Sequence, residues 1–90
     1  MLISDLLSPE RICCDVQSTS KKRLLELISE ELARNSDELS KREIFESLCA
    51  RERLGSTGLG NGVAIPHGRI KGSSHVQATF IRLKKPVPFD

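Results

Sequence analysis

Apolar residues at helical spacing mark residues 21–35 as a helix. The apolar positions recur at intervals of three, four and seven, as on one face of an α-helix, and they are Leu24, Leu25, Ile28 and Leu32. Ser20 is the expected N-cap, and Asn35 and Ser36 are expected to end the helix. On its polar side, Glu30 and Arg34 are four residues apart and are expected to form an ion pair.

A second helix is predicted to begin at Ser40. Ser40 and Glu43 have the spacing of a capping box, in which the serine hydroxyl and the glutamate carboxylate satisfy free backbone amides. Leu39 and Ile44 flank the box as a hydrophobic staple. The apolar stripe of this helix comprises Ile44, Phe45, Leu48 and Cys49. Both helices therefore have one face for a common core.

The remaining pattern predicts strands. Ile12–Val16 is a short apolar run, and Val76–Leu83 begins with alternating apolar and polar residues. Val63–Ile65 has the small and β-branched character of a buried strand, which Pro66 ends. Leu2–Leu7 is expected to form a short helical turn. The order helix, helix, strand, strand predicts an α/β or α+β fold, in which helices flank a mixed β-sheet.

Composition limits the class of protein. The chain has 90 residues, which we interpret as one domain over residues 1–90. Its 14 basic and 12 acidic residues are interspersed, and it has no Tyr or Trp for base stacking, so nucleic-acid binding is not expected. No signal peptide or membrane-spanning stretch is apparent, which predicts a cytoplasmic protein.

Cysteines and histidines give no sign of a metal centre. Cys13 and Cys14 are adjacent and Cys49 stands apart, a spacing that suits neither a disulfide framework nor a zinc site. We expect all three to be reduced thiols, buried or half-buried. The two histidines and scattered carboxylates lack paired ligand spacing, so neither a metal nor a cofactor is expected.

The segment over residues 54–68 carries the candidate chemistry. Its glycines can adopt positive φ and allow close approach to the main chain, so the loop could form a mould for an anion. His67 follows Pro66 at the end of the predicted strand, and Gly68 leaves the imidazole unshielded on one side. A neutral imidazole is a nitrogen nucleophile near neutral pH. The alternative is that His67 has no chemical role and merely lies at a turn of the chain.

This segment resembles a known phosphorylation-site signature, that of the enzyme IIA domains of the bacterial phosphotransferase system in the mannitol, fructose and nitrogen-regulatory branch. The residues at the signature's spacing are Glu52, Leu59, Gly60, Val63, Ala64, Ile65, Pro66, His67 and Gly68. Residues 17–23, 51–53, 55–58 and 60–62 look most like the nitrogen-regulatory subgroup. The resemblance implies the family's mixed sheet flanked by helices. Family members are longer than 90 residues, so we expect an N-terminal fragment that lacks a C-terminal half and its second active-site histidine.

The resemblance also implies roles for individual residues. His67 would accept a phosphoryl group from a histidine phosphocarrier resembling HPr. Arg51 is expected at the end of the second helix, where its guanidinium could grip phosphate oxygens; the alternative is a helix-end charge that faces water. Glu52 could orient a neighbour or form a surface ion pair. Ser56 and Thr57 are expected to bond their own backbone, and His75 is expected to be a loop residue without function.

Three functions fit this pattern. The first is a phosphocarrier of the nitrogen-regulatory branch, which acts on regulatory target proteins and whose phosphoryl group changes partner binding. The second is a sugar-specific enzyme IIA component that passes the phosphoryl group to a IIB domain. The third is a docking module that works without phosphorylation. An unpaired sheet edge and exposed apolar surface would also favour self-association of the chain.

Overall fold

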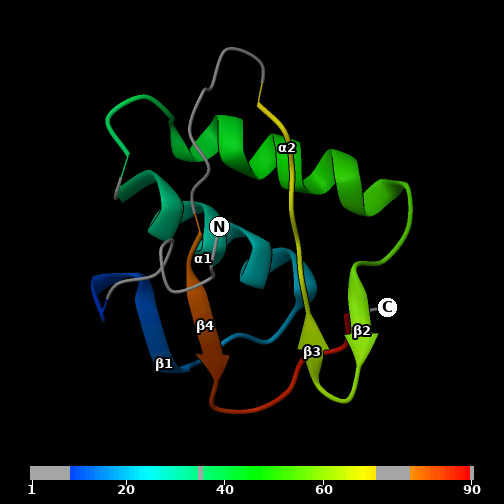
Figure 1. Cartoon of the computed structure of the whole chain (residues 1–90). Coiled ribbons are helices and arrows are strands. Elements are labelled where there is room, and N and C mark those ends of the chain that lie inside the picture. Colours follow the sequence, from blue (N-terminus) through cyan, green and yellow to red (C-terminus); the bar gives the residue numbers. More distant parts are fainter. Residues whose placement is uncertain (1–8, 35, 71–77, 90) are drawn as a thin grey trace, which may run out of the picture.

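The computed structural model describes residues 9–34, 36–70 and 78–89 of the chain (Figure 1). Its elements are a 3₁₀ turn over Pro9–Arg11, β1 (Ile12–Val16), α1 (Lys21–Arg34), α2 (Lys41–Arg53), β2 (Gly58–Gly60), β3 (Val63–Ala64) and β4 (Phe80–Leu83). The helical turn predicted for Leu2–Leu7 and the loop position of His75 lie outside the described residues.

Both helices begin at the serines that the sequence predicts. The Arg23 amide donates to the Ser20 hydroxyl oxygen at 3.1 Å, which caps α1. The Glu43 amide donates to the Ser40 hydroxyl oxygen at 3.2 Å, and the Ser40 amide donates back to the Glu43 carboxylate at 3.4 Å. The capping box at the start of α2 is therefore complete.

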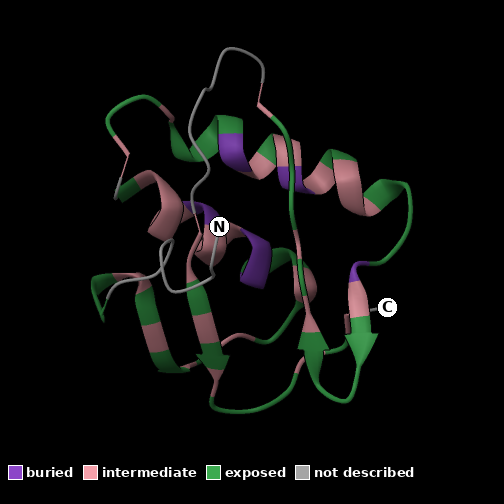
Figure 2. Cartoon of the chain, in the orientation of Figure 1, coloured by how far each residue is buried: buried purple, intermediate pink, exposed green. Residues whose placement is uncertain are grey.

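The core lies between the two helices. Leu25, Ile44 and Leu48 are its buried centre, and Figure 2 shows buried residues on both α1 and α2. Partly buried side chains pack around this centre, and they are Ile28, Leu32, Ala33, Leu39, Phe45, Cys49, Ile70 and Phe89. Burying each large aliphatic side chain contributes about 1.5–3 kcal/mol, so these contacts hold the helix pair together.

The ion pair predicted between Glu30 and Arg34 is wrong. Arg34 pairs instead with Glu31, and Glu30 accepts from Lys41 of α2 at 3.0 Å. The hydrogen bond from Lys41 is the largest influence on the Glu30 carboxyl and holds its pKa below the ordinary value. Because Lys41 reaches across from the other helix, this pair links α1 to α2, which sequence spacing within one helix could not reveal.

The fold class is confirmed as α/β, with both parallel and antiparallel pairing. β1 pairs with β4 in parallel, with Ile12 opposite Phe80, and β2 pairs with β3 antiparallel. In the described residues these are two separate two-stranded sheets. In the view of Figure 1 the strands stand in the order β1, β4, β3, β2 below the two helices. β4 begins at Phe80, later than the strand predicted over Val76–Leu83.

Two burial predictions are wrong. Val63 is 53% exposed and Ile65 57% exposed, and the strand ends at Ala64, so the predicted buried strand lies at the surface. Cys14 is exposed, whereas Cys13 is half-buried, because successive side chains of β1 point to opposite faces. Cys49 is half-buried as expected, and all three cysteines are free thiols.

Candidate functional site

The end of α2 delivers Arg51 to the loop that follows it. The helix ends at Arg53, and the Leu54 amide closes the last turn by donating to the Arg51 carbonyl oxygen at 3.1 Å. The Gly55 amide also donates to the Glu52 carbonyl oxygen at 3.2 Å. Arg51 and Arg53 lie in the last turn, as predicted, where positive charge complements the helix dipole.

A hairpin that the sequence analysis missed carries the next part of the site. Asn61 and Gly62 connect β2 to β3, with φ values of 56° and 78°. Two positive φ values are what a type I′ turn needs, and an Asn-Gly pair is the strongest short-range signal for such a turn. Past β3, the Ile65 amide donates to the Thr57 carbonyl oxygen at 3.1 Å. The hairpin thus sets the path of the chain two residues before His67.

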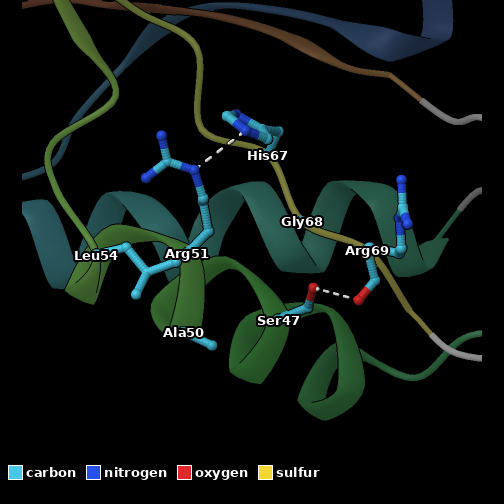
Figure 3. Close-up of a pocket in the computed structure, with 7 residues that line it drawn as sticks. All are labelled: Ser47, Ala50, Arg51, Leu54, His67, Gly68 and Arg69. Atoms are coloured by element: carbon cyan, nitrogen blue, oxygen red, sulfur yellow. Dashed lines mark hydrogen bonds between the residues drawn. The ribbon is translucent and has the colours of Figure 1, made fainter.

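Both ring nitrogens of His67 have hydrogen-bond partners, and Figure 3 shows the one from Arg51. Arg51 Nε lies 3.2 Å from His67 Nε2, and His67 Nδ1 lies 3.0 Å from the Ile65 carbonyl oxygen. An arginine nitrogen can only donate, so Nε2 accepts, and Nδ1 carries the proton that it donates to Ile65. The imidazole is therefore in the neutral tautomer whose lone pair is on Nε2.

The structure brings together the two residues that the sequence analysis selects, Arg51 and His67. Arg51 also donates from Nη1 to the Gly55 carbonyl oxygen at 2.9 Å, which fixes the guanidinium beside the ring. Its side chain is thus engaged in the site rather than turned only to water. The chemical roles of Arg51 and His67 remain predictions.

A hollow in the surface contains this pair. Its lining residues are Ser47, Ala50, Arg51, Leu54, His67, Gly68 and Arg69 (Figure 3). A Cβ atom on Gly68 would lie 2.2 Å from Ser47 Oγ and 3.0 Å from the Ser47 carbonyl carbon. The Ser47 hydroxyl donates to the Arg69 carbonyl oxygen at 3.1 Å. Glycine at position 68 therefore allows the segment after His67 to lie directly against α2.

Glu52 makes both of the interactions left open by the sequence, an ion pair and hydrogen bonds to a neighbour. Its side chain is only 5% exposed and accepts from Lys21 Nζ at 2.8 Å, across from α1. Both the amide and the hydroxyl of Thr57 donate to the same carboxylate. Burial acts to raise the pKa of Glu52, but the hydrogen bonds from Lys21 and Thr57 outweigh it and hold the pKa below its ordinary value.

Thr57 does not bond its own backbone as predicted, because its hydroxyl donates to Glu52. Ser56 does fulfil that expectation, since its hydroxyl oxygen accepts from the Gly58 amide at 3.1 Å. The amides of Gly55, Thr57 and Gly58 all donate within the protein. These three amides therefore do not form the anion mould that the sequence analysis expected.

Comparison with known families identifies the kind of domain. The family described as "Phosphoenolpyruvate-dependent sugar phosphotransferase system, EIIA 2" matches residues 5–90. The chain belongs to this EIIA type 2 family.

Among EIIA type 2 relatives, the chain is similar to nitrogen regulatory proteins. It is 46% identical to the nitrogen regulatory protein of Pseudomonas aeruginosa over 88 residues, which cover 98% of this chain and 57% of that protein. It is 44% identical to the nitrogen regulatory protein of Pseudomonas putida over 85 residues, which cover 94% of this chain and 96% of that protein.

A solved structure gives the same result. The crystal structure of nitrogen regulatory protein IIA-Ntr from Neisseria meningitidis superposes with a TM-score of 0.92 at 50% identity, covering 100% of this chain and 61% of that chain. This agreement confirms the EIIA-type fold. The chain thus spans somewhat more than half the length of the P. aeruginosa and N. meningitidis proteins.

The described part of this EIIA type 2 chain contains neither a cluster of metal ligands nor a helix that could span a membrane. Within residues 9–34, 36–70 and 78–89, no group of three or more His, Cys, Asp or Glu side chains is placed to hold a metal ion. In those same ranges, no helix has the length and apolar character needed to cross a bilayer.

Proposed function

We propose that this EIIA type 2 protein is a regulatory phosphocarrier that accepts a phosphoryl group on Nε2 of His67 from an HPr-like histidine phosphocarrier. The observation that carries the proposal is the tautomer of His67. Its Nδ1 proton is held by the Ile65 carbonyl oxygen and its Nε2 lone pair faces Arg51 Nε at 3.2 Å. The ring is exposed, so a partner protein could reach it.

The bonds that form and break in the transfer involve only the two imidazoles and the phosphoryl group. The Nε2 lone pair of His67 attacks the phosphorus of the donor's phosphohistidine, a new N–P bond forms, and the donor's N–P bond breaks with its electron pair returning to the donor ring. The His67 ring becomes positively charged as the bond forms. The Ile65 carbonyl oxygen, which already accepts from Nδ1, stabilises that charge because a hydrogen bond strengthens when its donor becomes cationic.

Arg51 supplies the electrostatic part of this proposal. A phosphoryl transition state spreads charge over three oxygens, so catalysis depends on positioning and on donors that meet this charge. The planar guanidinium can donate two parallel hydrogen bonds to such oxygens. In the structure Arg51 occupies the space in front of Nε2, and it would turn from the ring nitrogen to the phosphoryl oxygens as the group arrives.

The comparisons favour a regulatory role over a sugar-transport role. The nitrogen regulatory relatives from P. aeruginosa and P. putida are 46% and 44% identical. The EIIABC component of Escherichia coli specific for 2-O-alpha-mannosyl-D-glycerate is 26% identical, and the match covers 14% of it. We therefore propose that regulatory target proteins read the phosphorylation state, since the added negative charge changes partner binding. Transfer to a IIB domain is the second candidate, and a cytoplasmic location remains a prediction.

Intact-mass measurement tests the proposal. The protein is incubated with phosphoenolpyruvate, enzyme I and a histidine phosphocarrier, both as this chain and as a longer version continued as in the P. aeruginosa relative. We expect an acid-labile phosphoryl adduct that is lost in His67→Ala and kept in His75→Ala, the control at the other histidine of the chain. No adduct on either version would overturn the proposal. Regulation of a target that survives in His67→Ala would favour simple docking instead.

A further inference from the structure

A continuous path of hydrogen bonds connects α1 to the ring of His67. Lys21 Nζ contacts the Glu52 carboxylate at 2.8 Å, and that carboxylate accepts from both the amide and the hydroxyl of Thr57. The Thr57 carbonyl oxygen accepts from the Ile65 amide at 3.1 Å. The Ile65 carbonyl oxygen in turn accepts from Nδ1 of His67 at 3.0 Å. At each step a hydrogen bond connects one residue of the path to the next, from Lys21 to His67.

Few buried apolar contacts hold the loop that leads to His67. Between Arg53 and Ile70, Thr57 is the one buried residue, at 6% exposed. The large apolar side chains in this stretch are all exposed, and they are Leu54, Leu59, Val63 and Ile65. Apolar burial therefore contributes little to fixing the loop. Its position depends on polar contacts, those of Thr57 in the middle and those of Gly55 and Arg69 toward its two ends.

The anchor of the path is itself well fixed. Glu52 lies in α2 and Lys21 in α1, so their ion pair rests on the packed helix pair rather than on the loop. Lys21 also lies over the ring of Phe89, with Nζ 4.4 Å from its centroid, a cation–π contact. A nearly buried carboxylate with three donors has a narrow choice of geometry, because each donor that is lost leaves the charge less well compensated away from water.

We propose that Glu52 and Lys21 are positioning residues for His67: their ion pair fixes Thr57, Thr57 fixes the backbone of Ile65, and the Ile65 carbonyl oxygen, together with the Arg51 donor at Nε2, selects the tautomer with its proton on Nδ1 and its lone pair on Nε2. Without this path, the carbonyl oxygen would no longer be held opposite Nδ1. Arg51 Nε would still donate to Nε2, but loss of the Ile65 acceptor would raise the share of rings protonated at Nε2, the atom that must be unprotonated to act as a nucleophile. This last consequence rests on the proposed function.

The tautomer of His67 is the direct measurement. Nitrogen-15 NMR of the imidazole distinguishes a ring protonated at Nδ1 from one protonated at Nε2, and His67→Ala assigns the signals. In Glu52→Gln and Thr57→Val we expect the ratio of the Nδ1–H to the Nε2–H form to fall about tenfold, the change expected from weakening one hydrogen bond. Thr57→Ser keeps the hydroxyl and is expected to keep the parental ratio.

The chain offers a matched control. Glu46 is an exposed glutamate of the same helix that pairs with Arg42 at 3.0 Å, so Glu46→Gln makes the same chemical change away from the path. We expect no change in its tautomer ratio. If backbone NMR shows that Glu52→Gln does not fold, Thr57→Val and Lys21→Met replace it. The Lys21 side chain is 28% exposed, so we expect a substitution there to be tolerated by the fold.

Two readouts keep this proposal separate from the phosphocarrier proposal. A folded Glu52→Gln or Thr57→Val with the parental tautomer ratio overturns the positioning role, whatever the phosphorylation assay shows. A shifted ratio in a protein that is never phosphorylated supports the positioning role and overturns only the proposed function. Where transfer occurs, we expect a lower maximal rate with an unchanged half-saturating donor concentration, because the exposed surface offered to the donor is not altered.

Discussion

Replacing Gly68 by alanine tests how closely the segment that carries His67 packs against α2. The added methyl group would lie 2.2 Å from Ser47 Oγ, 3.1 Å from Ser47 Cβ and 3.0 Å from the Ser47 carbonyl carbon. The hydroxyl can rotate away, but it then loses its hydrogen bond to the Arg69 carbonyl oxygen. The other two atoms cannot rotate away, so the segment itself must shift.

The cost of the Gly68→Ala change can be worked out from these contacts. Loss of the Ser47 hydrogen bond costs about 1 kcal/mol, and the remaining crowding costs about 1–3 kcal/mol, as for other overpacked sites. Against this, alanine restricts the unfolded chain and returns about 0.4–1 kcal/mol. We therefore expect a net loss of about 2 kcal/mol in the free energy of unfolding.

Urea unfolding measures this loss as a lower midpoint at unchanged slope. Ser47→Ala and the double variant complete a mutant cycle. Because Ser47→Ala has already lost the hydroxyl, we expect Gly68→Ala to cost about 1 kcal/mol less in that background. A Gly68→Ala protein as stable as the parent, or a cycle without coupling, would refute the close approach of the two segments.

Three further predictions concern charge and surface. The pKa of Glu52 is lower in the folded than in the unfolded chain, so the unfolded chain takes up this proton first as the pH falls. The free energy of unfolding should therefore drop below about pH 5. Urea titrations across pH should show this drop, and it should be less steep in Glu52→Gln. Arg51→Lys keeps the charge but loses the planar fork, so the rate of phosphoryl transfer to His67 should fall about tenfold or more in a quenched-flow assay, and a rate equal to the parent's would contradict a bidentate role. Exposed apolar residues such as Leu54, at 85%, and Phe80, at 51%, should make the chain self-associate. A melting temperature independent of concentration in a demonstrated monomer would count against that.

Local signals in the sequence predicted the elements that local contacts stabilise. The capping box of Ser40 and Glu43 is complete within four residues, so the start of α2 could be predicted without knowing the rest of the fold. The Asn61–Gly62 turn carried an equally local signal, which was missed because its glycines were interpreted as an anion mould. The exposure of Val63 and Ile65 was not predictable, because composition does not show what covers a strand.

The candidate site likewise contains residues that local sequence patterns predict and contacts that they do not. His67 and Arg51 are near the ends of local patterns, a strand followed by Pro66 and a helix end, and both were selected from the sequence. The pairing of Glu52 with Lys21 is between residues 31 positions apart on different helices (52 − 21). Such a contact depends on how α1 packs against α2, and no periodicity within either helix encodes it.

The parallel pairing of β1 with β4 has a consequence for the order of folding. Ile12 and Phe80 lie opposite each other although 68 positions separate them (80 − 12), and the Thr79 hydroxyl donates to the Arg11 carbonyl oxygen over the same separation. Closing a loop of that length costs about 4 kcal/mol of chain entropy before any contact compensates it. The helix pair and the hairpin that lead to His67 close much shorter loops. We expect the chain to assemble this half early and to add β4 to β1 last, so that amide hydrogens of β4 exchange before those of the helices.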